Sequence, residues 1–319
     1  TNSGKLNQVV GFPLYAALDG VDLLHLHYVA PPFCPSPYVV TVHDILYERF
    51  PQFFGARHTS LLKVLVRLAA RRARHVIAVS EFTRRELIER YGLRGEAVSA
   101  IPLGVSGRFQ PPSAAVVGEA LGRLNVRRPY LLYVGRIAPI KNLAGLLRAF
   151  AHLHGRGIDV GLVIVGGRDR LFRETASAAV LAGMGVAAER VQFTGEVAEE
   201  DLVALYGGAE ALVFPSFGEG FGLPVAEAMA CGAPVLCSRA TSLPEVAGEA
   251  AWTFDPNDQE EFNARLEALL LDADARRALR EAGLARRRAF TWERTAREMI
   301  AVYERAARCG ERHAAGGAA

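Results

Sequence analysis

Short apolar runs alternate with amphipathic segments along most of the chain, and this alternation restricts the possible folds more than any other feature. In the first hundred residues, four apolar runs have the length of strands, and two segments have the period of helices. The predicted strands cover 21–27, 38–43, 75–80 and 98–103, and the predicted helices cover 60–74 and 81–91, the second with Ser80 as its N-cap. Alternating strands and helices build mainly parallel sheets, so an α/β fold is predicted.

A second series of the same kind follows a connecting segment. Residues 104–129 contain seven glycines and prolines and one modest helix, which is typical of a connection between domains. The six predicted strands beyond it cover 130–134, 161–165, 191–193, 211–214, 234–237 and 251–254. The predicted helices cover 144–154, 172–184, 199–207, 224–230, 259–271, 274–289 and 291–309. Six strands suffice for a complete doubly wound sheet, whereas the four of the first series do not.

The length of 319 residues is enough for about two domains, each with its own core. We predict a first domain at 1–108, joined by the helix 291–309, a second domain at 109–290, and a disordered tail at 310–319. The net charge of +3 is too small to indicate a nucleic-acid partner. The four cysteines form no C-x-x-C pair, so neither a disulfide framework nor a structural metal site is predicted, and a cytoplasmic location fits. No membrane span and no signal peptide are predicted.

A glycine-rich loop with two glutamates is the most specific motif. Residues 218–224 (GEGFGLP) follow the strand 211–214 and precede a predicted helix, so their backbone N–H groups and the helix N-terminus can bind an anion. A tight turn would explain the glycines but not the acids. Glu219 and Glu227 are separated by seven residues, and Glu227 lies on an apolar helix, where a carboxylate needs hydrogen-bond donors. Sugar and ribose hydroxyls would be suitable donors.

Two cations follow the strand 130–134. Arg136 and Lys141, one of only three lysines in the chain, lie at the edge where open α/β sheets bind ligands. They could bind a diphosphate and stabilise its charge as it leaves, or they could be a solvated pair in a loop. His43, at the end of the strand 38–43, could hydrogen-bond a sugar hydroxyl, or could be a core histidine bonded to the backbone. The patterns of nicotinamide-binding loops and P-loops do not occur in the required context.

The segments 79–87, 135–142 and 214–235 together resemble the retaining, nucleotide-sugar-dependent glycosyltransferases of family 4, also called glycosyl transferases group 1. This resemblance implies an α/β fold of the GT-B type, in which two Rossmann-like domains face a cleft. The first domain, on the acceptor side, would be incomplete, with about four strands. The implied reaction moves a hexose from a UDP-, GDP- or ADP-sugar donor to a carbohydrate, lipid-linked or other small acceptor. No cofactor and no metal are expected.

The resemblance also implies roles for individual residues. Arg136 and Lys141 would bind the donor diphosphate, and His43 would contact the transferred sugar near its anomeric centre. Glu219 would bind hydroxyls of the donor sugar, and Glu227 those of the ribose. The other donor-binding residues would offer backbone amides or surround the base; they are Phe221, Gly222 and Leu223, and Gly166, Gly195 and Val197. The loop 241–245 also resembles a loop of the family, with its role left open.

The sequence departs from the family at its N-terminal end. Family members open with a strand and a glycine-rich loop that are absent here, so about three strands, on the order of 70 residues, are expected to be missing or supplied by another chain. The strand 21–27 would then be an exposed sheet edge, and a surface for self-association or for a partner chain. A non-catalytic nucleotide-sugar-binding remnant, or one half of a split glycosyltransferase, is the alternative function.

One basic segment could contact a membrane. Six cations from Arg57 to Arg74 alternate with apolar residues and could bind an anionic membrane. Such binding would place the protein at the inner face of the membrane. The favoured alternative is an amphipathic helix that packs on the sheet and leaves a basic side in solvent.

Overall fold

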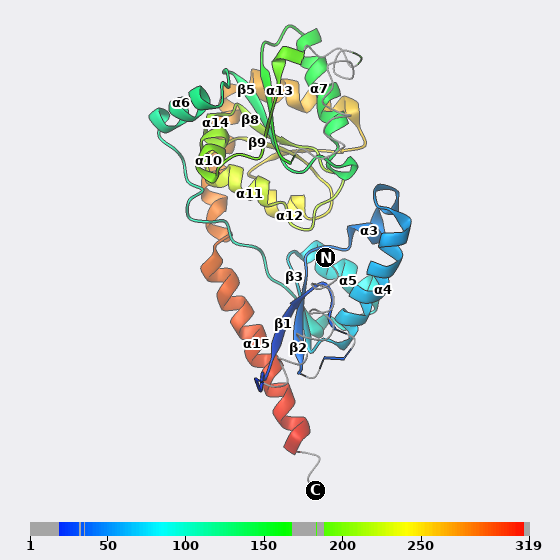
Figure 1. Cartoon of the computed structure of the whole chain (residues 1–319). Coiled ribbons are helices and arrows are strands. Elements are labelled where there is room, and N and C mark those ends of the chain that lie inside the picture. The colour runs from blue at the N-terminus through cyan, green and yellow to red at the C-terminus, as the bar shows by residue number, and fades with distance from the viewer. Residues whose placement is uncertain (1–18, 32, 35, 168–182, 184–187, 316–319) are drawn as a thin grey trace. The chain divides into compact units, whose positions relative to one another are not determined.

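The computed structural model describes residues 19–31, 33–34, 36–167, 183 and 188–315 (Figure 1). The chain divides into two compact units. Unit 1 comprises Thr1–Leu103 together with Trp292–Ala319, and unit 2 comprises Gly104–Thr291. Each unit is built around its own parallel sheet.

A four-stranded parallel sheet forms the centre of unit 1. Its strands lie side by side in sequence order: β1 (Leu24–His27), β2 (Tyr38–Val42), β3 (His75–Ala78) and β4 (Val98–Ala100). Every residue of β2 and β3 is buried, because helices cover both faces of the sheet, as near-continuous apolar strands require. The connecting helices are α3 (Leu46–Arg49), α4 (Ala56–Arg72) and α5 (Glu81–Tyr91), with single 3₁₀ turns at Pro51–Phe53 and Gly95–Ala97.

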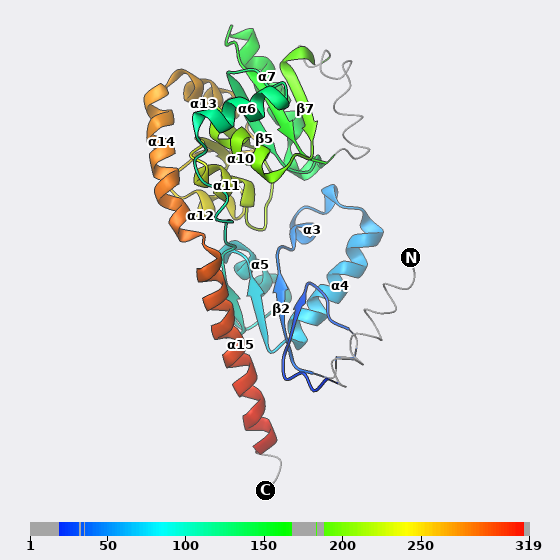
Figure 2. The same cartoon turned by 60° about the vertical axis from the view of Figure 1, so that its left-hand side comes forward.

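Successive residues of the central strands face opposite layers of unit 1. Val40 packs in a cluster with Val66 of α4, whereas Val39 packs with Val302 of α15 (Trp292–Ala315). The helices α4 and α15 therefore lie on opposite sides of this sheet, as Figures 1 and 2 show. This alternation is the two-residue period of a strand that is covered on both faces.

A six-stranded parallel sheet forms the centre of unit 2, in the order β10-β9-β8-β5-β6-β7. The first strand of the series, β5, thus lies between β8 and β6, which is the doubly wound arrangement with its reversal of strand order between β5 and β8. The strands are β5 (Tyr130–Val134), β6 (Gly161–Val165), β7 (Val191–Gly195), β8 (Ala211–Phe214), β9 (Val235–Ser238) and β10 (Trp252–Phe254).

The helices of unit 2 cover both faces of its sheet. They are α6 (Ala114–Arg123), α7 (Leu143–Gly155), α10 (Glu199–Gly208), α11 (Leu223–Ala230), α12 (Leu243–Ala247), α13 (Gln259–Leu271) and α14 (Ala273–Arg286), with 3₁₀ turns at Pro139–Lys141, Ala188–Arg190 and Arg287–Ala289. Apolar residues of α7 and α13 pack with β5 and β6 in one buried cluster. In the part of unit 2 that the structure describes, loops and helix N-termini follow the strands at the carboxyl edge of the sheet.

The strands of the two series are confirmed, four in the first sheet and six in the second. The Ser80 cap is also confirmed, since its hydroxyl accepts the amide hydrogen bond of Thr83 at 3.1 Å. One difference concerns the C-terminal segment. Residues 310–315, predicted as a tail, continue α15, because alanine, arginine and glutamate sustain a helix there. The helix predicted at 172–184 lies outside the described residues, apart from Gly183.

Among the helices that the structure describes, none combines the length and the apolarity needed to cross a membrane.

Candidate functional site

Three glycines lie at the carboxyl ends of neighbouring strands in unit 2. Gly135 follows β5, Gly166 follows β6, and Gly195 ends β7. The amide of Gly135 donates to the Val165 carbonyl at 2.9 Å, and the amide of Gly166 donates to the Gly195 carbonyl at 3.1 Å. A Cβ atom on Gly166 would overlap the carbonyl oxygen of Gly135. These glycines therefore bring three strand ends close together at the carboxyl edge of the sheet.

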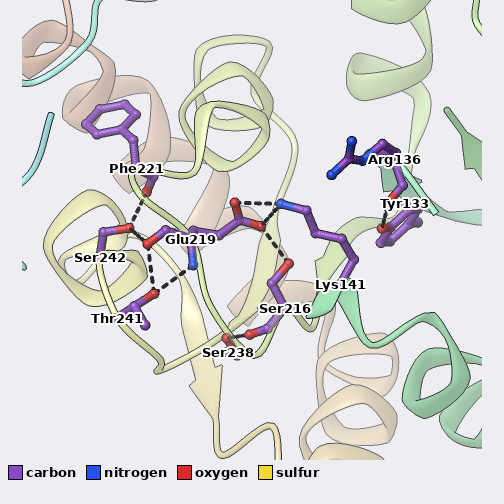
Figure 3. A network of polar contacts seen from close by, with 9 residues as sticks. All are labelled: Tyr133, Arg136, Lys141, Ser216, Glu219, Phe221, Ser238, Thr241 and Ser242. Atoms are coloured by element: carbon purple, nitrogen blue, oxygen red, sulfur yellow. Dashed lines mark hydrogen bonds and ion pairs between the residues drawn. The ribbon is translucent and has the colours of Figure 1, made fainter. Parts of the chain in front are cut away.

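An ion pair joins the two loops on either side of the reversal of strand order. Lys141 lies in the loop after β5 and Glu219 in the loop after β8. The Lys141 Nζ is 2.7 Å from both carboxylate oxygens of Glu219, and Figure 3 shows the two side chains pointing toward each other. Both side chains are largely withdrawn from solvent, with 20% and 11% of their surface exposed. The reversal point of a doubly wound sheet is where such folds bind ligands.

Hydroxyl groups hold Glu219 in place (Figure 3). The Ser216 hydroxyl donates to the Oε1 of Glu219 at 2.7 Å. The backbone amide of Glu219 donates to the Thr241 Oγ1 at 2.8 Å. The Ser242 hydroxyl lies 2.9 Å from the carbonyl oxygens of both Glu219 and Phe221. Because side chain and backbone are both fixed, the carboxylate is preorganised at the sheet edge.

The loop after Glu219 leads directly into α11. Phe221 is buried, and its ring meets that of Phe290 edge to face. Gly222 caps the helix with a φ of 109°, a conformation that side chains rarely adopt, and a Cβ atom there would lie 2.6 Å from Leu243. Leu223 begins the helix, so its amide is one of the unpaired N–H groups of the first turn. The positive end of α11 thus lies beside Glu219.

Arg136 lies in the same loop as Lys141 but is not joined to Glu219. Its side chain is exposed, and no carboxylate of the described residues lies within ion-pair distance of its guanidinium. Its carbonyl oxygen accepts a hydrogen bond from the Tyr133 hydroxyl at 3.3 Å. Burial raises the pKa of Tyr133, and the Glu219 carboxylate adds to this shift. Arg136 therefore contributes a positive charge that no acid of the described residues neutralises.

Glu227 lies apart from this network, one turn into α11. The buried Tyr206 hydroxyl donates to the Oε2 of Glu227 at 3.0 Å. The helix α10 therefore supplies one of the hydrogen-bond donors that a carboxylate on an apolar helix surface requires. Burial raises the pKa of Glu227, the Tyr206 hydrogen bond opposes this shift, and the nearby Glu199 charge adds to it. The residue is largely buried but not completely so, and its carboxylate can accept further hydrogen bonds.

His43 belongs to unit 1, where it forms part of a histidine stack. Its Nε2 lies 3.1 Å from the Nδ1 of His27, and the two rings are nearly parallel with centroids 5.3 Å apart. The His25 ring also stacks with that of His27, with centroids 5.0 Å apart, and the Tyr303 hydroxyl of α15 lies 2.7 Å from the Nδ1 of His25. Burial lowers the pKa of His43, His27 lowers it further, and Asp44 opposes both effects. A neutral imidazole that can donate or accept a hydrogen bond is therefore favoured.

The structure brings some of the residues predicted from sequence into contact with one another, whereas Arg136, Glu227 and His43 have other partners. The structure brings Lys141 to Glu219, and Gly166 to Gly195, with the half-buried Val197 two residues beyond. Sequence reasoning missed the hydroxyls of Ser216 and Ser242 as supports of Glu219, although the family-like pattern of the loop 241–245 was a signal for the second. It also missed Tyr206 and His27, which reach their partners from other elements. Within the described part of the chain, no cluster of three metal-ligating side chains is found.

Comparison with known proteins identifies the family of the chain. The family model "Glycosyl transferases group 1" matches residues 122–286, and the model "Glycosyltransferase Family 4" matches residues 5–106. O-antigen chain mannosyltransferase B of Escherichia coli is 33% identical over 272 residues, which cover 83% of this chain and 70% of that protein. The MMP alpha-(1->4)-mannosyltransferase of Mycolicibacterium hassiacum is 34% identical over 246 residues, 74% of this chain and 55% of that one.

Solved structures show the same fold. The structure of Anabaena HepE in complex with UDP and glucose superposes with a TM-score of 0.77 at 20% identity, covering 94% of this chain and 83% of that one. The chain therefore belongs to the glycosyl transferases group 1, the glycosyltransferases of family 4 that have the GT-B fold.

Proposed function

We propose that this chain transfers a hexose from a nucleoside diphosphate sugar to a carbohydrate or lipid-linked acceptor, with retention of configuration at the anomeric carbon. The observation that carries the proposal is the Lys141–Glu219 pair at the reversal of strand order. A carboxylate accepts hydrogen bonds from sugar hydroxyls, and the ammonium group beside it can bind the phosphate that carries the sugar.

Lys141 and Arg136 would each bind oxygens of the donor diphosphate. An ammonium group has three N–H donors, and two of those on Lys141 are directed at Glu219, which leaves one for a phosphate oxygen. The Arg136 guanidinium can bind the diphosphate as a fork without breaking an ion pair of the described residues. The amides of Phe221 and Gly222, just before α11, and of Leu223, its first residue, would add N–H donors. Gly166, Gly195 and Val197 would surround the base, and Glu227 would bind the ribose.

The positive charges of Arg136 and Lys141 suit a reaction in which the diphosphate leaves the same face of the donor sugar that the acceptor attacks. The bond between the anomeric carbon and the diphosphate oxygen breaks, the acceptor oxygen bonds to that carbon on the same face, and the acceptor proton passes to the diphosphate. Arg136 and Lys141 would stabilise the negative charge that develops on the leaving group. His43 would hydrogen-bond the transferred sugar.

Mannose is the hexose we would test first, because two relatives are named mannosyltransferases. The nucleotide is proposed to be UDP, GDP or ADP, and the Anabaena structure was solved with UDP. The comparisons give no sign of a non-catalytic remnant. We further propose a cytoplasmic location, membrane contact through residues 57–74, and association with another chain through the edge strand β1.

Transfer from a panel of labelled donors tests the proposal. The chain would be incubated with UDP-, GDP- and ADP-hexoses and simple mannoside acceptors, with the Glu219→Gln variant as control. We expect one donor class to give a product with the anomeric configuration of the donor, and the variant to give far less. An inverted product would contradict the retaining mechanism, and no product from any donor with any acceptor would contradict the transferase function.

A further inference from the structure

A cavity lies at the amino edge of the sheet of unit 2. Its volume is about 620 Å³, and it is lined by the segments that lead into three neighbouring strands. The first residue of each strand is part of the lining: Tyr130 of β5, Gly161 of β6 and Val191 of β7. Sites for small molecules usually have volumes of about 300–1,000 Å³, so this cavity has the size of a metabolite site. We call it the amino-edge cavity.

The amino-edge cavity is separate from the proposed donor site. Because the three strands run parallel, their amino ends meet at one edge of the sheet, and their carboxyl ends, with Gly135, Gly166 and Gly195, meet at the other. A strand of five residues spans about 17 Å, which is the separation of the two edges. None of the residues that line the cavity is assigned to the donor site. The inference that follows therefore does not rest on the proposed transfer reaction.

Three arginines line the amino-edge cavity. Arg127 and Arg128 are exposed, and neither has an ion-pair partner among the residues that the structure describes. Arg190 pairs through its Nη2 with Asp159, which also lines the cavity. With Glu189 the lining has two acids against three arginines, so it carries an excess of one positive charge. Arginine binds phosphate through the planar fork of its N–H groups, which favours a phosphate as the ligand.

The Nε of Arg190 is a buried hydrogen-bond donor without an acceptor. In the described part of the chain, it is the one buried side-chain nitrogen or oxygen atom that has no hydrogen-bond partner. Buried polar groups are nearly always hydrogen-bonded, so an orphaned N–H group on the wall of a cavity indicates a place for an acceptor. A phosphate oxygen is an acceptor of the matching charge.

Hydrogen-bond acceptors lie beside the arginines. The Glu189 carboxylate is exposed and has no ion-pair partner among the described residues. The Gln192 side chain donates to the Leu124 carbonyl at 2.6 Å, which leaves the amide oxygen of Gln192 as an acceptor. A carboxylate repels a bare phosphate ion but accepts hydrogen bonds from hydroxyl groups. The lining therefore suits a molecule that has both a phosphate and hydroxyls.

We propose that the amino-edge cavity binds a small phosphate ester with several hydroxyl groups, as in a sugar phosphate. The guanidinium groups of Arg127 and Arg190 would bind the phosphate oxygens. Glu189 and the Gln192 oxygen would accept hydrogen bonds from the hydroxyls. Such a ligand uses the cations, the orphaned donor and the acceptors of the cavity together, whereas inorganic phosphate would use only the first two.

Titration calorimetry of the full chain with hexose and pentose phosphates tests the proposal, with inorganic phosphate and glucose as reference ligands. We expect at least one sugar phosphate to bind at least roughly tenfold more tightly than either reference, and more weakly at high salt. Arg127→Gln, which changes an exposed side chain without an ion pair, should weaken this binding roughly tenfold. Glu189→Ala should reduce the preference for the ester over inorganic phosphate.

Matched controls separate this cavity from the donor site and from general attraction to cations. Arg280→Gln/Arg288→Gln removes two exposed arginines outside the cavity lining and should bind as the parent chain does. Arg136→Gln/Lys141→Gln changes the proposed donor site and should also keep the binding.

Three results would overturn the proposal. The first is that no sugar phosphate binds the folded chain. The second is that inorganic phosphate binds as tightly as the esters, which would leave the hydroxyl groups unrecognised. The third is that the binding survives Arg127→Gln unchanged but is lost in Arg136→Gln/Lys141→Gln, which would assign it to the donor site. Circular dichroism should show that every variant is folded.

Discussion

The Nζ of Lys141 lies 2.7 Å from both carboxylate oxygens of Glu219, although the two residues are 78 positions apart in the chain. Each belongs to a loop that leaves one of the two strands at the reversal of strand order, β5 and β8. The pair therefore links the cation that we propose for the donor phosphate with the carboxylate that we propose for the donor sugar. Its geometry leads to predictions for the loop, for its supports and for the reaction.

Replacing Ser242 should loosen the Glu219 loop. The buried Ser242 hydroxyl lies within hydrogen-bond distance of two carbonyl oxygens, those of Glu219 and Phe221. Ser242→Ala leaves these buried acceptors without that donor, so the free energy of unfolding should fall by about 1–3 kcal/mol in urea titration. Ser106→Ala, at a half-buried loop position, is the control and should change it by less. Equal stability of the Ser242 variant and the parent would show that water replaces the hydroxyl.

Gly166 should not tolerate a side chain. A Cβ atom there would overlap the carbonyl oxygen of Gly135, so the ends of β5 and β6 would have to move apart. Gly166→Ala should lower the free energy of unfolding by about 1–3 kcal/mol and weaken nucleotide binding. Gly118→Ala in α6, where nothing lies within 4 Å of the added carbon, should instead raise it by about 0.5–1 kcal/mol. If both variants melted at the same temperature, the close approach of the strand ends would be unimportant.

Glu227 should make stability depend on pH. Its pKa is raised in the folded chain above the ordinary value of 4.5, because the carboxylate is buried. The folded state therefore binds more protons than the unfolded state above that pH, and stability is lost as the pH rises through the folded pKa. Glu227→Gln keeps the shape without the charge, so its advantage over the parent should grow from acid to neutral pH in thermal unfolding. The same variant should bind nucleotide more weakly if Glu227 holds the ribose. A constant difference between the two proteins across this range would refute the shift.

His27 should control the titration of His43. The pKa of His43 is lowered from 6.5 by burial and, next, by His27, whose Nδ1 is 3.1 Å away. Because the folded state then binds fewer protons than the unfolded state, this histidine costs stability as the pH falls through 6.5. His27→Phe preserves an aromatic ring and removes the charge, so the pKa of His43 should rise in an NMR titration. An unchanged pKa of His43 would contradict the contribution of His27.

Local patterns predicted most of the fold. The strands 130–134, 161–165 and 211–214 and the helices 81–91 and 259–271 have the bounds that apolar runs, glycines and caps indicate. The helix α12 was missed, because its five residues are too few for a periodic pattern. The end of α15 was missed, because small residues suggested fraying where the helix continues to Ala315.

The site was predicted in part, for a physical reason. The spacing of Glu219 and Glu227 and the place of Lys141 after a strand are local features, and they located these side chains. Their partners are not local: Tyr206 reaches Glu227 from α10, and Ser242 reaches Glu219 from the loop after β9. His27 meets His43 because β1 and β2 pair in parallel, with His27 opposite Thr41. Such contacts depend on strand order and register, which no single segment encodes.

The most direct test of the central claim is the turnover of the Lys141→Ala variant, measured beside its affinity for the donor. If Lys141 stabilises the leaving diphosphate, kcat should fall by roughly 10²–10³-fold, while the donor Kd changes far less. Arg108→Ala, which removes an exposed cation of unit 2, is the control and should leave both values unchanged. An unchanged kcat for Lys141→Ala, or a loss confined to donor binding, would contradict the catalytic role proposed for the Lys141–Glu219 pair.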